Sequence, residues 1–146
     1  MYSVLVIARW FLSKEAMTHK KLQKLCYYAQ AWHWALLKTP LIDSDFQAWV
    51  HGPVSPILYS QYKEYGWTPI SKYSKRIVGI KKEDKEFLER VWISYGEYDG
   101  SQLESLTHEE LPWLNARRGV GQWENSNNVI SAKDMEHYYL SQYIGD

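Results

Sequence analysis

The sequence predicts a mainly α-helical protein, a compact domain of about six helices with a small β-element. Apolar residues recur at helical spacing in several stretches of the chain. Serine, threonine or proline residues stand where some of these stretches begin, as they do at helix N-termini. Strand-like composition is confined to short segments. The length of 146 residues fits one folded domain, which we expect to span residues 1–146.

The first two predicted helices have the most regular apolar patterns. Val4, Ile7 and Phe11 would share one face of a helix of about three turns. Thr18 is a suitable N-cap for the second helix, and Pro40 lies beyond its end. The apolar stripe of this second helix is wide enough for burial on more than one side, so we expect the helix to be central. The stripe contains Leu22, Leu25, Cys26, Ala29, His33 and Leu36.

The β-element is expected from two short segments. Residues 46–50, FQAWV, are aromatic and β-branched, and a Gly52-Pro53 turn follows them. Residues 67–80 contain β-branched and turn residues but no helical period. We therefore expect a strand at 46–50 that pairs with a strand at 76–80.

Two further helices are predicted between residues 55 and 95. Ser55 and Pro56 have the residue types of an N-cap and a first helical position, and Gly66 is placed to end that helix. Glu83 and Asp84 would occupy the first turn of the next helix, where acidic side chains interact favourably with the helix dipole. The apolar stripe of that helix contains Phe87, Leu88, Val91, Trp92 and Tyr95.

Shorter helices are predicted towards the C-terminus. Ser101 and Glu104 have the spacing of a capping box, and Pro112 would begin another short helix. Residues 119–128 are polar and rich in glycine and asparagine, which is typical of a mobile loop. Ser131 is a suitable N-cap for a terminal helix.

The composition argues against several functional classes. Seventeen basic and seventeen acidic residues give a formal net charge of zero, so the chain as a whole does not attract phosphate backbones or anionic membranes. No stretch approaches the roughly 20 apolar residues of a membrane span, and no signal peptide is evident. The lone Cys26 lies in a helical apolar pattern and is expected to be a buried thiol. We expect a cytoplasmic protein without membrane association.

The aromatic content favours a protein-binding function. The chain has eight Trp and twelve Tyr but only three Phe. Trp and Tyr rings combine a large contact area with a polar atom that needs a partner, and both are enriched at protein interfaces. We expect most of these rings to build the core and the others to serve an interface.

The sequence does not predict a metal, cofactor or catalytic site. The five histidines lie in separate predicted elements and form no H-x-x-x-H pair. Thr107, His108, Glu109 and Glu110 resemble an acid–base cluster, but side-chain caps at a helix–turn junction explain them better. His33, on an apolar helix face, is expected to be a hydrogen-bonded core residue. We therefore expect no enzymatic activity and no cofactor.

Two groups of basic residues raise the alternative of nucleic-acid binding. Residues 20–24 contain three lysines, and residues 72–82 contain five basic residues with Tyr73 among them. Such a mixture would allow backbone contacts and base stacking. Both groups are better explained as solvated rims, and no recognition helix is evident, so nucleic acid is not the favoured partner. Arg117 and Arg118 leave two alternatives open, contact with an acidic partner and capping of a helix.

Several motifs occur in the order found in a known family. The stretch from Lys21 to Tyr65 joins an aromatic-rich helix, an AW-V-HGPV segment and a proline-started helix, and a TH-PW motif follows further on. On these motifs the sequence resembles the Panacea antitoxin-domain family, which includes GepA-like and SocA-like phage-associated proteins. The densest matches are Lys21–Leu25, Tyr27–Gln30, Pro40-Leu41, Ala48-Trp49, Gly52–Val54, Leu58-Tyr59, Tyr62-Lys63, Thr107-His108 and Pro112-Trp113.

The resemblance implies that the chain is a single Panacea-like antitoxin domain. Family members look like helical cytoplasmic antitoxins that neutralise a cognate protein toxin, encoded by an adjacent gene, through direct protein contact. Some resemble adaptors that present a toxin to a cellular protease, and a nucleic-acid-binding regulatory protein is the remaining alternative. No appended DNA-binding module is evident, which puts regulation of its own promoter in doubt. The oligomeric state stays open, a homo-oligomer included.

Five motif residues are our candidates for the partner-binding surface. Interface energy commonly concentrates in a few Trp, Tyr and Arg side chains, which favours the aromatic members of the motifs. The alternative is that the motifs are scaffold and that less distinctive surface residues contact the toxin. The candidates are Trp49, His51, Tyr59, His108 and Trp113.

Overall fold

The protein is helical around one central helix. The structure, a computed structural model, describes residues 1–145, within which the chain forms seven α-helices and a two-stranded hairpin. This confirms the predicted fold class, with one helix more than the approximate number expected. The elements are α1 (Val4–Leu12), α2 (His19–Leu37), β1 (Gln47–Trp49), β2 (Gly52–Val54), α3 (Pro56–Tyr62), the 3-10 turn η1 (Lys63–Tyr65), α4 (Lys82–Tyr95), α5 (Gly100–His108), α6 (Leu111–Ala116) and α7 (Ala132–Ile144).

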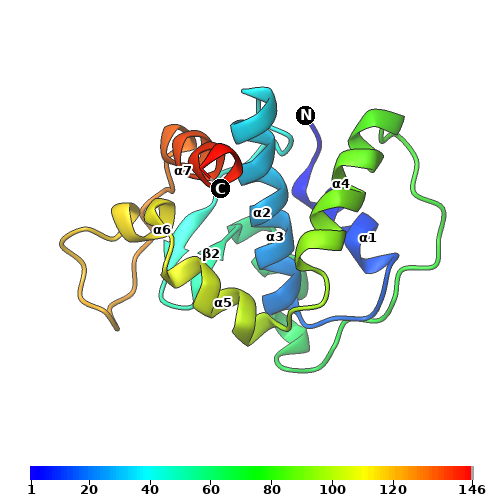
Figure 1. The fold of residues 1–146 in the computed structure, drawn as a ribbon. Coiled ribbons are helices and arrows are strands. Elements are labelled where there is room, and N and C mark those ends of the chain that lie inside the picture. Colours follow the sequence, from blue (N-terminus) through cyan, green and yellow to red (C-terminus); the bar gives the residue numbers. More distant parts are fainter. Residues whose placement is uncertain (146) are drawn as a thin grey trace.

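Helix α2 is the centre of the core. All of α1, α3, α4, α5, α7 and β2 pack against it, and α6 and α7 lie on the side of α2 opposite α1 and α4 (Figure 1). Every residue from 21 to 31 is buried, so the helix is enclosed on all faces. The hydroxyl of Thr18 caps its N-terminus by accepting from the backbone N–H of Lys21, and Lys38 ends it in the left-handed conformation. The predicted central helix is confirmed.

Polar side chains on α2 bind the backbone of segments packed around it. The Gln30 side chain accepts from the backbone N–H groups of Leu41 and Ile42 and donates to the Ile42 carbonyl. In the same way Gln23 accepts from the backbone N–H of Ser55 and donates to its carbonyl. Buried backbone groups in a loop need partners, and these amides supply them. The glutamines of the motif at 21–30 therefore hold the loops before and after the hairpin in place.

The β-element differs from the predicted pairing. Residues 47–49 form a strand as expected, but they pair with residues 52–54 across a tight turn, and residues 76–80 belong to no strand. Closing a short hairpin costs less chain entropy than bringing together segments about 30 residues apart. The outer edge of β1 is occupied by the segment before α7, because the Ala48 N–H donates to the Asn128 carbonyl and the Ile130 N–H donates to the Phe46 carbonyl.

Local signals placed most helix starts correctly. Ser55 and Ser131 cap α3 and α7 as predicted, and Gly66 follows η1 with a positive φ. The capping box predicted at Ser101 was wrong. It lies two residues earlier, where the Asp99 carboxylate accepts from the Gln102 N–H and the Gln102 side chain accepts from the Asp99 N–H.

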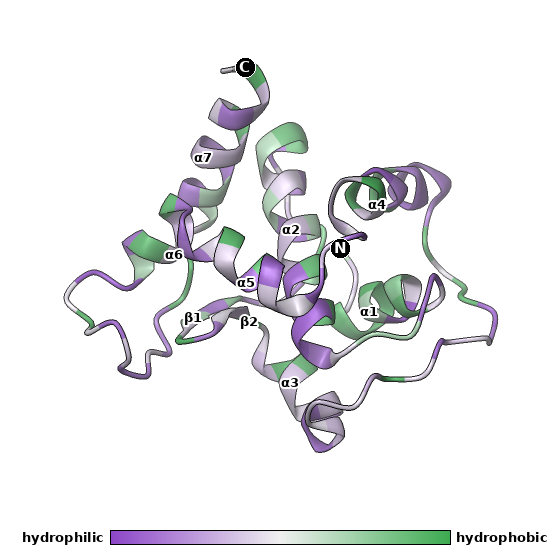
Figure 2. Ribbon diagram, turned by 60° about the horizontal axis from the view of Figure 1, so that its bottom comes forward, coloured by the Kyte–Doolittle hydropathy of each residue, from purple (hydrophilic) through white to green (hydrophobic). Residues whose placement is uncertain are grey.

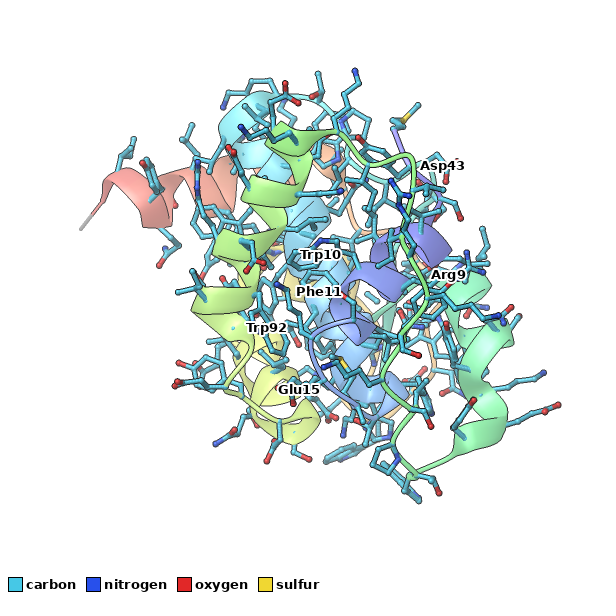
Figure 3. All side chains as sticks on the ribbon, turned by 90° about the vertical axis from the view of Figure 1, so that its right-hand side faces the viewer. Arg9, Trp10, Phe11, Glu15, Asp43 and Trp92 are labelled. Atoms are coloured by element: carbon cyan, nitrogen blue, oxygen red, sulfur yellow. The ribbon has the colours of Figure 1, made fainter. Side chains whose placement is uncertain are left out.

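Helices α1 and α4 cover one side of α2. Figure 3 shows Trp10 and Phe11 of α1 in the space between α1 and α4, and both side chains are buried. The Lys14 ammonium forms an ion pair with Glu89 on α4 and lies 4.7 Å from the centre of the Trp10 ring. His33 of α2 is buried behind α4, with its Nδ1 bonded to the Thr39 carbonyl, which confirms the predicted core histidine.

Two long connections extend from opposite sides of this core. Residues 66–81 join η1 to α4, and residues 117–131 join α6 to α7 (Figure 2). Residues 119–128 of the second connection were predicted to be a mobile loop. Arg117 anchors the start of this connection by donating to the carbonyls of Ala48, Gly121 and Glu124. Arg117 is thus occupied within the fold. No helix of residues 1–145 has the length and apolar character that a membrane crossing requires.

Candidate functional site

The hairpin carries the AW-V-HGPV motif and lies between α6 and α3 (Figure 2). Trp49 and Gly52 pair at its end, so Val50 and His51 form the two-residue turn. Gly52 has φ 107°, and a Cβ on it would lie 2.5 Å from Cε of Lys24. Only glycine fits this position because both its backbone angle and the space require it. Pro53 is tolerated because Ala48 opposite it directs its own N–H and carbonyl to Asn128 and Arg117.

Four of the five candidate residues form one aromatic cluster around this hairpin. The Trp49 and Tyr59 rings meet edge to face with their centres 5.0 Å apart. Trp113 donates its indole N–H to the Trp49 carbonyl at 2.9 Å, and the His108 ring stacks on Trp113 at 4.1 Å. The fifth, His51, stands beside the cluster on the turn. Residues distant in the sequence are thus brought together.

The cluster has an inner and an outer layer. Trp113 is only 7% exposed and belongs to the inner layer, with Arg117 at 5.0 Å from its ring centre. His108 is half-buried, and its Nε2 is enclosed without a hydrogen-bond partner among the described residues. Trp49 and Tyr59 are half-buried like His108, while the His51 side chain is 71% exposed. Trp49, Tyr59 and His51 form the outer layer, which has surface accessible to another molecule.

A cleft of about 360 Å³ opens beside the outer layer. Its walls come from the N-terminal turns of α2, the hairpin, α3 and the start of the 66–81 connection. Aromatic rings and basic side chains dominate the lining, and no aspartate or glutamate belongs to it among the described residues. The lining residues are His19, Lys20, Gln23, Lys24, Trp49, His51, Val54, Tyr59, Lys63, Gly66 and Trp67.

Lys24 lies at the base of this cleft and is 1% exposed. Its ammonium donates to the Pro53 carbonyl at 3.2 Å, which ties α2 to β2. Burial lowers the pKa of Lys24 to about 7, with Lys20 acting in the same direction and Glu104 opposing it. The prediction of a solvated lysine rim at residues 20–24 was therefore wrong for two of its members, since Lys21 is also buried and donates to the Gly96 carbonyl at 2.6 Å.

Glu104 of α5 is held between two basic side chains at the edge of the cleft. It forms an ion pair with Lys20 and accepts from His51 at 3.2 Å. Partial burial raises the pKa of Glu104, but the hydrogen bonds and charges of Lys20 and His51 outweigh this and lower it overall. This carboxylate therefore neutralises Lys20, and the remaining lysines of the cleft are left without an acidic partner among the described residues.

A second polar cluster is buried between α2, α6 and α7. One oxygen of Glu110 accepts from the hydroxyls of Tyr28 and Tyr139, both at 2.7 Å, and the Tyr139 hydroxyl lies 3.1 Å from that of Tyr27. Burial raises the pKa of Glu110 to about 7, against the opposing effect of the two tyrosine hydroxyls. The cluster is enclosed by protein, and its place at the junction of three helices indicates a role in packing.

The residues that resembled catalytic groups are used within the fold. Cys26 is fully buried, and burial raises the pKa of its thiol far above the usual range, so the thiolate is not available as a nucleophile. The Thr107 hydroxyl donates to the Glu104 carbonyl one turn earlier in α5. Within residues 1–145, no three His, Cys, Asp or Glu side chains are grouped so that they could bind a metal ion.

Sequence reasoning missed several residues of the cleft. Lys63 and Trp67 were treated only as parts of a helix and of an irregular segment, and Lys24 only as part of a basic rim. Trp67 is 84% exposed, which is unusual for so large an aromatic side chain. The motif at residues 62–63 was a signal for Lys63, whereas nothing in the sequence placed Trp67 in the same cleft as Tyr59.

Comparison with known proteins agrees with the positions of these motifs. The sequence model of the family described as "Antitoxin SocA-like, Panacea domain" matches residues 22–114, which include all five candidate residues. Antitoxin SocA of Caulobacter vibrioides (strain NA1000 / CB15N) is 27% identical over 132 residues, covering 79% of this chain and 70% of the relative. No solved structure gives a significant match. The chain belongs to the SocA-like antitoxin family, the family of the Panacea domain.

Proposed function

We propose that this protein is an antitoxin that neutralises a cognate protein toxin, encoded by an adjacent gene, through direct contact with the outer layer of the aromatic cluster. Family membership supports the antitoxin role. The observation that carries the choice of surface is the partly exposed Trp49–Tyr59 pair, whose ring centres lie 5.0 Å apart.

The base of this pair is what makes it suitable for binding. Trp113 fixes the Trp49 backbone from below, and Gln23 fixes the backbone of Ser55 at the start of the helix that carries Tyr59. Side chains that are already ordered lose little conformational entropy when a partner binds. Exposed aromatic rings on such a support are typical of the few residues that dominate interface energies. The scaffold and interface interpretations of the motifs are thus divided between its two layers.

Direct neutralisation in the cytoplasm is proposed over the alternatives. The net charge of zero gives no general attraction to nucleic acid. The buried Cys26 is chemically compatible with a reducing compartment. Delivery of the toxin to a protease would need the same recognition surface, and it is distinguished from direct neutralisation by the fate of the toxin.

The test is growth of cells that express the product of the adjoining reading frame together with variants of this protein. The parent should restore growth, and Trp49→Ala and Tyr59→Ala should each weaken binding of the purified toxin about 30-fold, as expected when an interface anchor is truncated. Trp123→Ala and Tyr143→Ala are matched controls, because both rings are exposed and neither lines the cleft. All variants must first show the thermal unfolding of the parent.

The possible results test separately the antitoxin role, the binding surface and the mode of neutralisation. Rescue by folded Trp49→Ala and Tyr59→Ala variants at the parent level would show that the toxin binds elsewhere. Failure of the parent to protect against the adjoining product would remove the antitoxin proposal for that gene pair. Rescue that requires a host protease, with a shortened toxin half-life, would establish the adaptor alternative in place of direct neutralisation.

A further inference from the structure

The cleft beside the aromatic cluster has features that the predicted site residues do not explain. Trp67 projects at its rim with 84% of its surface exposed, and the Lys20 ammonium lies 5.9 Å from its ring centre. Lys63 is exposed on the same rim, at the start of η1. Together with Tyr59 these residues give this part of the cleft lining both aromatic rings and basic side chains.

The charges of the cleft are not balanced. Three lysines and two histidines line it, and Glu104 at its edge is already bound by Lys20 and His51. Lys24 and Lys63 form no ion pair within the described residues. The Lys24 ammonium has three donors and a single acceptor, the Pro53 carbonyl. The excess positive charge of the cleft is therefore carried mainly by Lys63, with a partial contribution from Lys24 because burial lowers its pKa to about 7. Such a local excess attracts anions.

The titration of His19 indicates the same positive field. His19 lines the cleft and packs against Tyr59 with their ring centres 6.0 Å apart. Burial lowers the pKa of His19, and the positive charge of Lys24 lowers it further. Burial is the larger cause, and the Lys24 contribution shows that the positive charge of this lysine reaches the His19 side of the cleft.

We propose that this cleft receives an acidic segment of the toxin, with a carboxylate beside Lys63 and an apolar side chain between Trp67 and Tyr59. The inference rests on the proposed function and names the chemistry of its partner. An aspartate or glutamate would supply the acidic partner that Lys63 lacks, and the rings would bury the neighbouring apolar group. The cleft volume of about 360 Å³ suits a few side chains.

A protein segment fits these observations better than a nucleic acid. The basic residues at 72–82 do not line the cleft, so the positive surface does not continue as a groove that could follow a phosphate backbone. The chain also carries no net charge to support such binding. Contact with one or two carboxylates needs only the local excess that the cleft provides.

The experiment measures the affinity of the purified product of the adjoining reading frame for cleft variants of the full chain. Lys63→Glu should weaken binding at least about 10-fold at low salt, and the loss should shrink as salt is raised. Trp67→Ala should weaken it by a similar factor. Lys85→Glu on α4 and Trp123→Ala in the 117–131 connection are the matched controls, because both residues are exposed and lie outside the cleft, and they should bind like the parent.

A charge exchange identifies the acidic segment. Aspartate and glutamate residues of the toxin are replaced one at a time by lysine, and at least one such variant should regain affinity for Lys63→Glu while losing affinity for the parent. Parent-like binding by both Lys63→Glu and Trp67→Ala would overturn the inference and leave the proposed function intact.

Two further outcomes would overturn the inference. Absence of any binding by the parent would overturn the proposed function, and the inference would fall with it. A twelve-nucleotide oligothymidylate that binds the parent, loses affinity in Lys63→Glu and competes with the toxin would show that the cleft is a nucleic-acid site and would overturn the inference.

Discussion

Replacement of Glu110 by glutamine tests how α7 is held against α2. In the parent one carboxylate oxygen accepts from Tyr28 and Tyr139, each at 2.7 Å, in a buried site. Glutamine has nearly the same shape and keeps a carbonyl oxygen for both hydroxyls, but it cannot ionise. The substitution therefore removes the titration and preserves the contacts.

The expected effect follows from the shift in the pKa of Glu110. Burial raises this pKa from 4.5 to about 7. A carboxyl group with a raised pKa in the folded state binds its proton more tightly there, so its contribution to stability is complete below pH 4.5 and is lost as pH rises through about 7. For these two values the linkage relation gives a loss of about 2–3 kcal/mol between pH 5 and pH 8. Glu110→Gln should not show that loss.

Other groups titrate in the same range, but their contributions to stability cancel when the variant is compared with the parent. The lowered pKa values of His19 and His108, both caused mainly by burial, make stability rise with pH at the acidic end, and Lys24 makes it rise above about pH 7. All three remain in the variant. The quantity to measure is the free energy of unfolding of Glu110→Gln minus that of the parent, from urea titrations at several pH values.

This difference should increase by about 2–3 kcal/mol from pH 5 to pH 8. The exposed neighbour provides the control, since Glu109→Gln also removes a carboxylate from the chain but not from the buried cluster. A difference for Glu110→Gln that stays constant within about 0.5 kcal/mol across this range would refute the reasoning, because it would mean that Glu110 has the same pKa in both states.

Two other substitutions test the supports of the site. Gly52→Ala should lower the free energy of unfolding by about 2–4 kcal/mol in urea titration, since φ 107° and the 2.5 Å approach to Lys24 both exclude a Cβ; a change under about 0.5 kcal/mol would show that the turn rearranges freely. Gln30→Ala should cost about 2–4 kcal/mol in the same assay, because it leaves the N–H groups of Leu41 and Ile42 without their partner. The exposed Gln122→Ala is its control, and an equal effect of both would contradict the anchoring role.

The helices could be predicted because their signals are local. Thr18, Ser55 and Ser131 cap helices through contacts within three residues, so the chain near each start contains the whole signal. The capping box of α5 shows the limit of such reasoning. Ser101 and Glu104 have the same spacing as Asp99 and Gln102, and only the position of the helix start decides which pair is used.

Features that depend on distant partners could not be predicted. The strand at 47–49 was found from local composition, but nothing in the sequence indicated that residues 128–130 would occupy its outer edge. Lys21 and Lys24 look like surface lysines and are buried because the carbonyls of Gly96 and Pro53 accept from them.

For the candidate site, shared motifs pointed to Trp49 and Tyr59, which the fold does bring together. The same motifs could not show that Trp113 lies beneath the pair and Trp67 at the rim of the cleft. The difference between these two tryptophans is one of burial, and burial depends on how α2, the hairpin and α3 pack together.

Hydrogen–deuterium exchange of the protein with and without the purified toxin tests the central claim most directly. If the toxin binds the outer layer of the aromatic cluster, backbone amides of residues 47–67 should exchange more slowly in the complex, while those of α4 and of the 117–131 connection should be unchanged. Slower exchange confined to α4, α7 or the 117–131 connection, with no change at 47–67, would contradict the account.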